Sequence, residues 1–303
     1  MKQFVLILPF LIFSNCAGFL LKTAIQAERG KGNLERKQMD IEKFSVPFLE
    51  SSSSNKIPIV FLHGFGGDKD NWIRMIPHLK DQYRAISLDL PGFGESNRLP
   101  DENYSIAEQV KRVKKFTEKL GLKKFHIVGN SMGGSISAYY ASQYPDEIIS
   151  LILIDSAGVT SPIKSDLEIE IEKGYNPLLV KNMDDFDKLN NFIFVKKPYI
   201  LGSIKEYFVE KALENTNINV KILNDIRNEK NPVEVSLSKI KSHTLILWGD
   251  TDRIIHVSST QVFQKNIKNS KLIVLKDCGH SPQIERPEEV ASHILQFVSS
   301  IQP

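Results

Sequence analysis

The chain has 303 residues, of which 41% are hydrophobic and 25% charged, and its formal net charge is +3. This composition excludes a disordered or fibrous chain and predicts one large globular domain with room for an inserted subdomain. Cys16 and Cys278 are its two cysteines, so no disulfide framework holds the fold together. Because the charge is mild and the basic residues are scattered, we expect no nucleic-acid partner.

The N-terminal residues, 1–25, have the pattern of an export signal or a membrane anchor. An uncharged stretch covers residues 3–21. Its most apolar segment, 4–13, has the length of a signal-peptide hydrophobic core rather than of a membrane span. Cys16 directly follows LIFSN, which is similar to a relaxed bacterial lipoprotein box. Three alternatives stay open: a lipid on Cys16, an uncleaved anchor, and an ordinary cleaved signal. We therefore expect an exported protein, anchored in a bacterial cell envelope by a lipid or by the apolar segment.

The charged residues 26–41 are predicted to form an exposed connector between this segment and the folded core. A short edge strand is expected at 41–50, and the polar turn SSSSN follows at 51–55. The core is therefore expected to begin at residue 42.

Beyond that point, short apolar runs recur along the chain. They are continuous rather than alternating, which is typical of strands buried on both faces of a parallel sheet. The runs cover residues 57–63, 83–90, 125–129, 148–155, 243–250 and 271–277.

Helical patterns separate several of these runs. Over 105–120, apolar residues recur with helical spacing behind a Ser105/Glu108 capping box. Further helices are expected over 132–144 and 287–298. The basic residues of the first helix are expected to form its solvated face; they are Lys111, Arg112, Lys114, Lys115 and Lys119.

The alternation of strands and helices predicts a doubly wound, mostly parallel α/β sheet. Its regularity breaks at 159–239, where amphipathic patterns rich in lysine and asparagine carry few strand signals. We interpret this segment as a helical cap inserted into a core that spans 42–158 and 240–303.

The motif GNSMG provides the first chemical signal. The motif joins a predicted strand, which ends at Gly129, to a predicted helix, which starts at Met132. Ser131 lies at the junction, with Gly129 and Gly133 on either side, which is the context of a nucleophile elbow. In such an elbow a sharp turn exposes the serine hydroxyl, and side chains two residues away on either side would collide with neighbouring elements. Ser131 is therefore the candidate nucleophile, and a plain strand-to-helix turn is the alternative.

A serine hydroxyl needs a base within hydrogen-bond reach to attack near neutral pH. His280 follows the last predicted strand and precedes the last helix, at the sheet edge where α/β proteins place their sites. It is the expected base. Other histidines have structural explanations in strands, helices or loops; they are His78, His126, His243, His256 and His293.

The third member of such a site is a carboxylate that fixes the imidazole tautomer and stabilises the imidazolium. Asp250 and Asp252 follow the penultimate predicted strand, and Asp155 ends an earlier one. The chain order serine, aspartate, histidine favours Asp252. Asp250 and Asp155 remain as alternatives that would otherwise serve as turn or cap residues.

An oxyanion hole requires two backbone N–H groups aimed at the substrate carbonyl oxygen. The expected donors are Met132, which follows the nucleophile, and Phe65 in the loop HGFGGDKDNW. That loop lacks the G-K-[S/T] ending of a phosphate-binding loop. No H-E-x-x-H motif or paired Cys/His spacing occurs either, so we expect neither a metal nor another cofactor.

Several segments together resemble the α/β-hydrolase superfamily and, within it, membrane-bound monoacylglycerol lipases and related bacterial lipases. They are FLHGFGGDKDNW, LDLPGFGES, VGNSMGGSIS, LILIDSAG, LILWGDTDRI and CGHSPQIERPEEV, and the likeness covers about residues 42–300. The resemblance implies the α/β-hydrolase fold with an inserted cap. It also implies a catalytic triad of Ser131, Asp252 and His280, with the Phe65 and Met132 N–H groups as the oxyanion hole.

The function that this resemblance implies is hydrolysis of carboxylic esters, in particular monoacylglycerols, through an acyl-enzyme. A lipid substrate is also favoured by an apolar cluster at 192–201 in the predicted cap, although ordinary core packing would explain the same cluster. Alternatives are a carbon–carbon bond hydrolase, a short-chain soluble esterase and a ligand-binding sensor without activity. The carbon–carbon hydrolases carry a tryptophan where Ile284 stands here. The expected partners are an ester or lipid substrate and a membrane surface, and the oligomeric state is left open.

Overall fold

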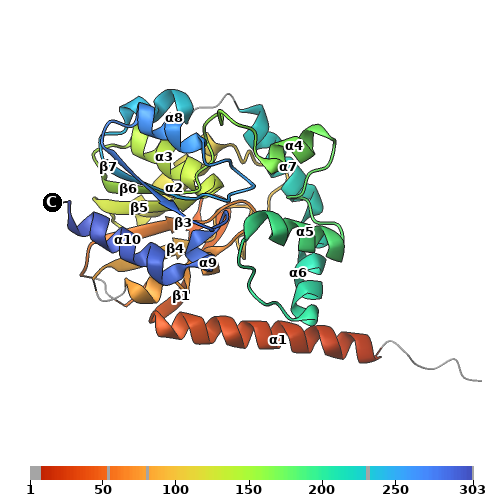
Figure 1. Cartoon of the computed structure of the whole chain (residues 1–303). Helices are drawn as coiled ribbons and strands as arrows, with labels where there is room; N and C mark the ends of the chain where they lie inside the picture. The colour runs from red at the N-terminus through yellow and green to blue at the C-terminus, as the bar shows by residue number, and fades with distance from the viewer. Residues whose placement is uncertain (1–7, 53–54, 80–81, 230–232, 302–303) are drawn as a thin grey trace, which may run out of the picture.

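The computed structural model in Figure 1 has one central sheet with helices on both faces. The structure describes residues 8–52, 55–79, 82–229 and 233–301. The strands are β1 (Leu34–Ile41), β2 (Phe44–Ser51), β3 (Pro58–Leu62), β4 (Arg84–Leu88), β5 (Phe125–Asn130), β6 (Ile148–Ile154), β7 (His243–Gly249) and β8 (Ser270–Leu275).

Within those ranges the strand order is β1-β2-β4-β3-β5-β6-β7-β8. Strands β3 to β8 are parallel to one another, and β2 runs antiparallel to both of its neighbours, β1 and β4. The predicted mostly parallel sheet is confirmed, and its apolar runs are β3 to β8. Because the carboxyl ends of parallel strands meet at one edge, the loops after β3, β5, β7 and β8 converge there.

Most helices lie in the connections between these strands. The helices are α1 (Leu8–Lys31), α2 (Ile106–Lys119), α3 (Met132–Gln143), α4 (Asp166–Glu172), α5 (Met183–Ile193), α6 (Gly202–Glu214), α7 (Thr216–Asn228), α8 (Ser259–Asn266), α9 (Pro282–Glu285) and α10 (Pro287–Ser299). Helix α1 precedes β1, whereas α9 and α10 follow β8. Three short 3₁₀ segments within the described ranges are η1 (Lys69–Trp72), η2 (Ile76–His78) and η3 (Glu234–Lys239).

The sheet separates two apolar cores. Val60 of β3 packs in one core with Ile136 of α3, and the next residue, Phe61, packs in the other with Ile294 of α10. Helices α2, α3 and α8 and the 3₁₀ segment η3 cover the first core, while α10, η1 and η2 cover the second. This two-sided burial explains why the parallel strands are continuous apolar runs.

Helix α2 begins as the capping signal predicts but buries one of its basic residues. Ser105 Oγ accepts a hydrogen bond from Glu108 N (3.4 Å), whereas the Glu108 carboxylate pairs with Lys111 rather than completing the box. Arg112 was expected on the solvated face, but it is buried, with its guanidinium 4.5 Å from the ring centre of Phe44. A planar guanidinium stacks well on an aromatic face, which is why this position tolerates a charged side chain.

The exposed connector expected over 26–41 is not what the structure contains. Helix α1 continues to Lys31, and β1 then pairs with the whole of β2, from Leu34 opposite Ser51 to Ile41 opposite Phe44. Half of the side chains of β1 are exposed and charged, as in edge strands protected against further pairing. The edge strand is therefore β1, and the strand predicted around 41–50 is the second in the sheet.

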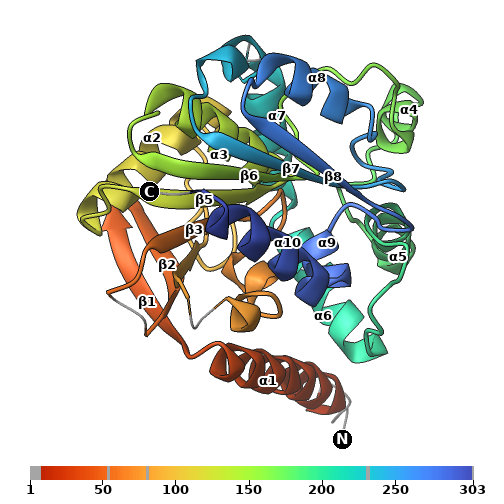
Figure 2. The same ribbon diagram turned by 60° about the vertical axis from the view of Figure 1, so that its left-hand side comes forward.

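The segment between β6 and β7 is helical and contains α4 to α7 and η3. In both views α1 lies beside α6, below the sheet (Figures 1 and 2). A Cβ placed on Gly18 of α1 would lie 3.8 Å from the Tyr207 ring of α6. Near its end, Arg29 donates two hydrogen bonds of 2.7 Å to the Asp70 carboxylate of η1. Among the helices of the described ranges, none combines the length and apolar composition that crossing a membrane requires.

Candidate active site

Ser131 occupies a strained turn between β5 and α3, with φ 56° and ψ −121°. Its N–H donates to the carbonyl of Ile154, at the end of β6 (3.1 Å). A Cβ on Gly129 would lie 2.1 Å from the carbonyl oxygen of Gly133, and one on Gly133 would lie 2.1 Å from that of Leu62. Side chains at these two positions are therefore sterically impossible without moving the turn, which is the reason for the G-x-S-x-G spacing.

His280 and Asp252 form a buried hydrogen-bonded pair. Asp252 Oδ2 lies 2.8 Å from His280 Nδ1, and Asp252 Oδ1 accepts the N–H groups of Ile254 (2.8 Å) and Ile255 (3.0 Å). A carboxylate that accepts a hydrogen bond from Nδ1 fixes the ring proton on Nδ1 and leaves Nε2 free to accept a proton. Asp250, the neighbouring alternative, is exposed and accepts only from its neighbour's hydroxyl among the contacts of the described residues.

Asp155, the second alternative, lies beside this pair but does not replace Asp252. A carboxylate oxygen of Asp155, one of Asp252 and a ring nitrogen of His280 all lie within 4.8 Å of one another. Burial, together with the charge of Asp252, raises the pKa of Asp155 well above its ordinary value. These three groups are also a possible cation site by spacing, but the His280–Asp252 hydrogen bond already uses two of the ligand atoms.

Two buried amides, Asn130 and Gln283, connect the elbow to the histidine loop. Asn130 Nδ2 donates to the carbonyls of Ile154 (3.1 Å) and His280 (3.1 Å), and Gln283 Nε2 donates to Asn130 Oδ1 (3.1 Å). The residue before the nucleophile thus holds the backbone of the base in place. Neither amide was predicted from the sequence, although the place of Asn130 inside the GNSMG motif is a signal that could have identified it.

The glycine-rich loop after β3 passes directly against the nucleophile. A Cβ on Gly64 would lie 3.0 Å from Ser131 Cβ, and Gly66 has a left-handed backbone with φ 71°. Within the described residues, the backbone N–H groups of Phe65 and Met132 donate to no protein acceptor outside regular secondary structure. The glycine-rich loop therefore contacts the nucleophile turn, as an oxyanion hole made from these two segments would require.

Buried polar contacts fix the conformation of this glycine-rich loop. Lys69 Nζ is 3.0 Å from Asp89 Oδ2, and Asp89 Oδ1 accepts the Lys69 N–H (2.7 Å). His63 Nδ1 is 2.8 Å from the Gly64 carbonyl, while its Nε2 accepts from Leu90 N (3.0 Å). Burial lowers the pKa of His63, which keeps the ring neutral and able to make both contacts.

The segment between β6 and β7 is seated against the histidine loop. The Ile193 carbonyl, at the end of α5, accepts the His280 N–H (2.7 Å). The Glu285 carboxylate of α9 accepts the N–H groups of Val195 and Lys196, each at 3.2 Å. A rearrangement of residues 193–196 would therefore break the hydrogen bond to the His280 N–H and could displace the expected base.

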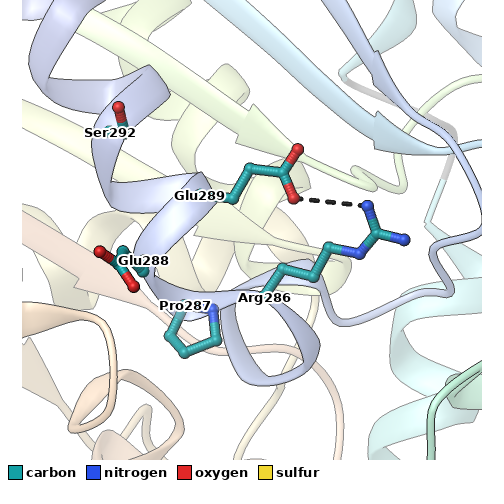
Figure 3. Close-up of a pocket in the computed structure, with 5 residues that line it drawn as sticks. All are labelled: Arg286, Pro287, Glu288, Glu289 and Ser292. Carbon is teal, nitrogen blue, oxygen red and sulfur yellow. Dashed lines mark hydrogen bonds and ion pairs between the residues drawn. The ribbon is translucent and has the colours of Figure 1, made fainter.

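A surface cavity of about 540 Å³ lies at the start of α10 (Figure 3). Its lining consists of Arg286, Pro287, Glu288, Glu289 and Ser292, and Arg286 pairs with Glu289 across it. The lining contains no member of the expected site, and its charged groups do not suit an acyl chain. We therefore do not assign the substrate to this cavity.

Comparisons with known proteins agree with this geometry. The family model described as alpha/beta hydrolase fold matches residues 57–287. Lipase 1 of Psychrobacter immobilis is 35% identical over 282 residues, covering 92% of this chain and 88% of that protein. Monoacylglycerol lipase ABHD6 of Homo sapiens is 30% identical over 261 residues, covering 82% and 77%.

A solved structure also superimposes on nearly the whole chain. It is the crystal structure of a membrane phospholipase A described as a novel bacterial virulence factor. Its TM-score is 0.92 at 38% identity, covering 94% of this chain and 92% of that one. A 2-hydroxy-6-oxo-6-phenylhexa-2,4-dienoate hydrolase from Rhodococcus has a TM-score of 0.76 at 22% identity, with 88% and 99% covered. The second similarity shows the fold alone.

Proposed function

Since the chain belongs to the α/β-hydrolase family and is an ester hydrolase of the lipase type, we propose that it cleaves acylglycerols, with monoacylglycerols foremost, and that Ser131 is its nucleophile. The observation that carries this proposal is the meeting of the Ser131 elbow and the buried His280–Asp252 pair at one sheet edge, tied together by Asn130. The lipases among its relatives supply the substrate class.

In the proposed mechanism, Ser131 Oγ attacks the ester carbonyl while His280 Nε2 accepts its proton. The N–H groups of Phe65 and Met132 stabilise the negative oxygen of the tetrahedral intermediate. His280 then returns the proton to the departing glycerol oxygen, and Asp252 stabilises the imidazolium meanwhile. Water, activated by the same imidazole, hydrolyses the acyl-enzyme and releases the fatty acid.

The alternatives are less well supported. The ring-fission hydrolases share the fold, but the identity to the solved example is only 22%. A ligand-binding sensor without activity would not require an assembled His280–Asp252 pair beside a strained serine. No observation therefore favours a second candidate function.

We expect kcat/KM of the full-length chain on p-nitrophenyl esters to rise with acyl length, by about fourfold per buried methylene until the site is filled. Monoacylglycerols should be hydrolysed faster than triacylglycerols with the same acyl group. The panel runs from acetate through octanoate esters to mono- and triacylglycerols, with Ser131→Ala as the blank. Fastest turnover on acetate would point to a short-chain esterase and would contradict the proposal.

We also propose that the enzyme works at a lipid surface. Part of the apolar cluster expected at 192–201 is not core packing, because Tyr199 is 90% exposed and Leu201 46%, whereas residues 192–194 are half-buried. The two exposed residues precede α6, and α1 beside α6 exposes Phe19 (70%) and Leu20 (55%) (Figures 1 and 2). Exposed apolar side chains gathered on neighbouring elements are typical of a surface that contacts lipid. The lipid or apolar N-terminal anchor remains a prediction, since residues 1–7 and the Cys16 side chain lie outside what the structure describes.

The double variant Tyr199→Ser and Leu201→Ser is expected to lower binding to liposomes severalfold, because each exchange removes exposed apolar area that would enter the lipid interface. Liposome flotation of the full-length chain measures this, and turnover of a soluble ester should stay unchanged. The matched control is Val235→Ser on η3, an exposed apolar residue (77%) that should leave binding as it was. Equal binding of the double variant and the wild type would count against this surface.

A further inference from the structure

Asp155 is a buried carboxyl group that the proposed mechanism does not use. It follows β6 with a left-handed backbone (φ 43°), and it is fully buried. Its N–H donates to the Leu247 carbonyl (3.0 Å), and its Oδ1 accepts the Gly249 N–H (2.9 Å). Its other oxygen, Oδ2, is buried and has no hydrogen-bond partner among the described residues. A buried oxygen without a partner is costly, so its surroundings require an explanation.

The surroundings of Asp155 are acidic. Asp252 lies beside it in the cluster with His280, and Glu285 of α9 is the other carboxylate that faces it; Cys278 is a further titratable neighbour. Asp252 already accepts two backbone N–H groups on Oδ1 and the His280 ring on Oδ2. Donors thus stabilise the charge of Asp252, whereas Asp155 has the single N–H of Gly249.

Two negative carboxylates this close together in a buried site repel each other strongly, so one of them holds a proton. Asp252 is the better anion because it receives three hydrogen bonds, and the proton therefore belongs to Asp155. A proton on Asp155 would also turn the unpartnered Oδ2 into a donor.

We propose that Asp155 is held as a neutral carboxylic acid whose O–H donates a hydrogen bond to Asp252, so that it acts as a positioning residue for the histidine–aspartate pair. The raised pKa of Asp155, caused first by burial and then by Asp252, agrees with this assignment. The proposal rests on the proposed function, because His280 and Asp252 must be the base and its partner. Its effect is to orient Asp252 and disperse its charge without adding a second negative charge beside the base.

The variant Asp155→Asn tests the protonation state directly. An asparagine keeps an oxygen for the Gly249 N–H and offers an amide N–H to Asp252, so it imitates the neutral acid but cannot ionise. The acid limb of the kcat/KM profile follows protonation of His280, and we expect its midpoint to move by less than about 0.3 pH unit in this variant. If Asp155 were ionised, Asp155→Asn would remove a negative charge near the imidazole and lower the midpoint by about one unit or more. That result would overturn the proposal.

A second variant, Asp155→Ala, tests whether the donated hydrogen bond affects the pair. Without the donor, the Asp252 charge acts on His280 undiminished, and we expect the acid midpoint to rise by about half a pH unit. Circular dichroism and thermal melts establish that both variants are folded. A midpoint unchanged in Asp155→Ala as well as in Asp155→Asn would mean that Asp155 has only a structural role, and would overturn the proposal.

Infrared spectroscopy provides a test that does not depend on activity, with the folded Asp155→Asn variant used to assign the band. In D₂O at about pH 8.5, we expect one protonated carboxyl C=O band, absent from Asp155→Asn. Asp68, whose pKa is raised to about 7 by burial and by Asp70, is ionised at that pH. Absence of the band would overturn this proposal while leaving the serine mechanism intact. Full activity of Ser131→Ala with the band present would instead contradict the proposed function and, with it, the positioning role, while Asp155 would still be a neutral acid.

Discussion

Replacing Ser131 with alanine is expected to lower kcat by about 10⁶-fold, as loss of the nucleophile does in other serine triads. Alanine keeps the Cβ of serine, so the strained turn at φ 56° and its contacts to Ile154 should survive. The loss is therefore expected in kcat, with the melting temperature close to that of the wild type. Steady-state hydrolysis of a p-nitrophenyl ester measures it, and labelling by a fluorophosphonate probe should disappear in parallel.

The control for this variant is Ser135→Ala, which removes a hydroxyl from a buried serine one turn further along α3. Its N–H bonds to the Ser131 carbonyl (3.2 Å) through the backbone, so the side-chain exchange leaves that contact intact. We expect its kcat to stay within about threefold of the wild type, as for other modest core changes without a catalytic role. Wild-type turnover by Ser131→Ala would refute the serine mechanism outright.

The exchange Asp252→Asn is expected to lower kcat by about 10⁴-fold with little change in KM, by analogy with the same exchange in other triads. Asp252 accepts hydrogen bonds from His280 and from the N–H groups of Ile254 and Ile255. An amide accepts at one of its two positions only, and when its nitrogen faces the ring, the imidazole must adopt the wrong tautomer. The base would then present an N–H, rather than a lone pair, to the serine hydroxyl.

Asp250→Asn is the matched control for this second experiment, because it makes the same exchange two residues away on the same turn. Asp250 is exposed, and its carboxylate accepts from the Thr251 hydroxyl (2.8 Å). We expect its kcat to stay within about twofold, since exposed turn residues away from a site have small effects. A large loss in Asp250→Asn and none in Asp252→Asn would mean that the third member of the triad has been misassigned.

Much of the fold was predictable because its signals are local. Strands β3 to β7 are apolar runs buried on both faces, β8 is a partly exposed apolar run at the sheet edge, and α2 and α3 begin where a cap or an elbow places them. The glycines around Ser131 were equally readable, since a Cβ at Gly129 or Gly133 would lie 2.1 Å from a backbone oxygen. Such steric requirements act within a few residues, so they appear in the sequence as glycines at fixed spacing.

The errors concern elements whose environment comes from distant residues. Half of the residues of β1 are charged, and only its pairing with β2 makes it a strand. The burial of Arg112 depends on Phe44, an aromatic residue of a strand far from it in the chain. Neither partner can be inferred from the spacing of residues within the element itself.

The sequence by itself determined the order of the strands along the chain, the elbow at Ser131, and the small set of carboxylates at strand ends. The chain order favoured Asp252 among them, but only the tertiary structure decided that Asp252 meets His280, because that depends on which strands are neighbours and on where each loop turns. The structure places Asp252 Oδ2 at 2.8 Å from His280 Nδ1, leaves Asp250 exposed, and buries Asp155 beside the His280–Asp252 pair. Distances of this kind follow from sheet order and side-chain packing, which join Asp252 to His280, 28 positions further along the chain, and Asn130 to His280, 150 positions further along.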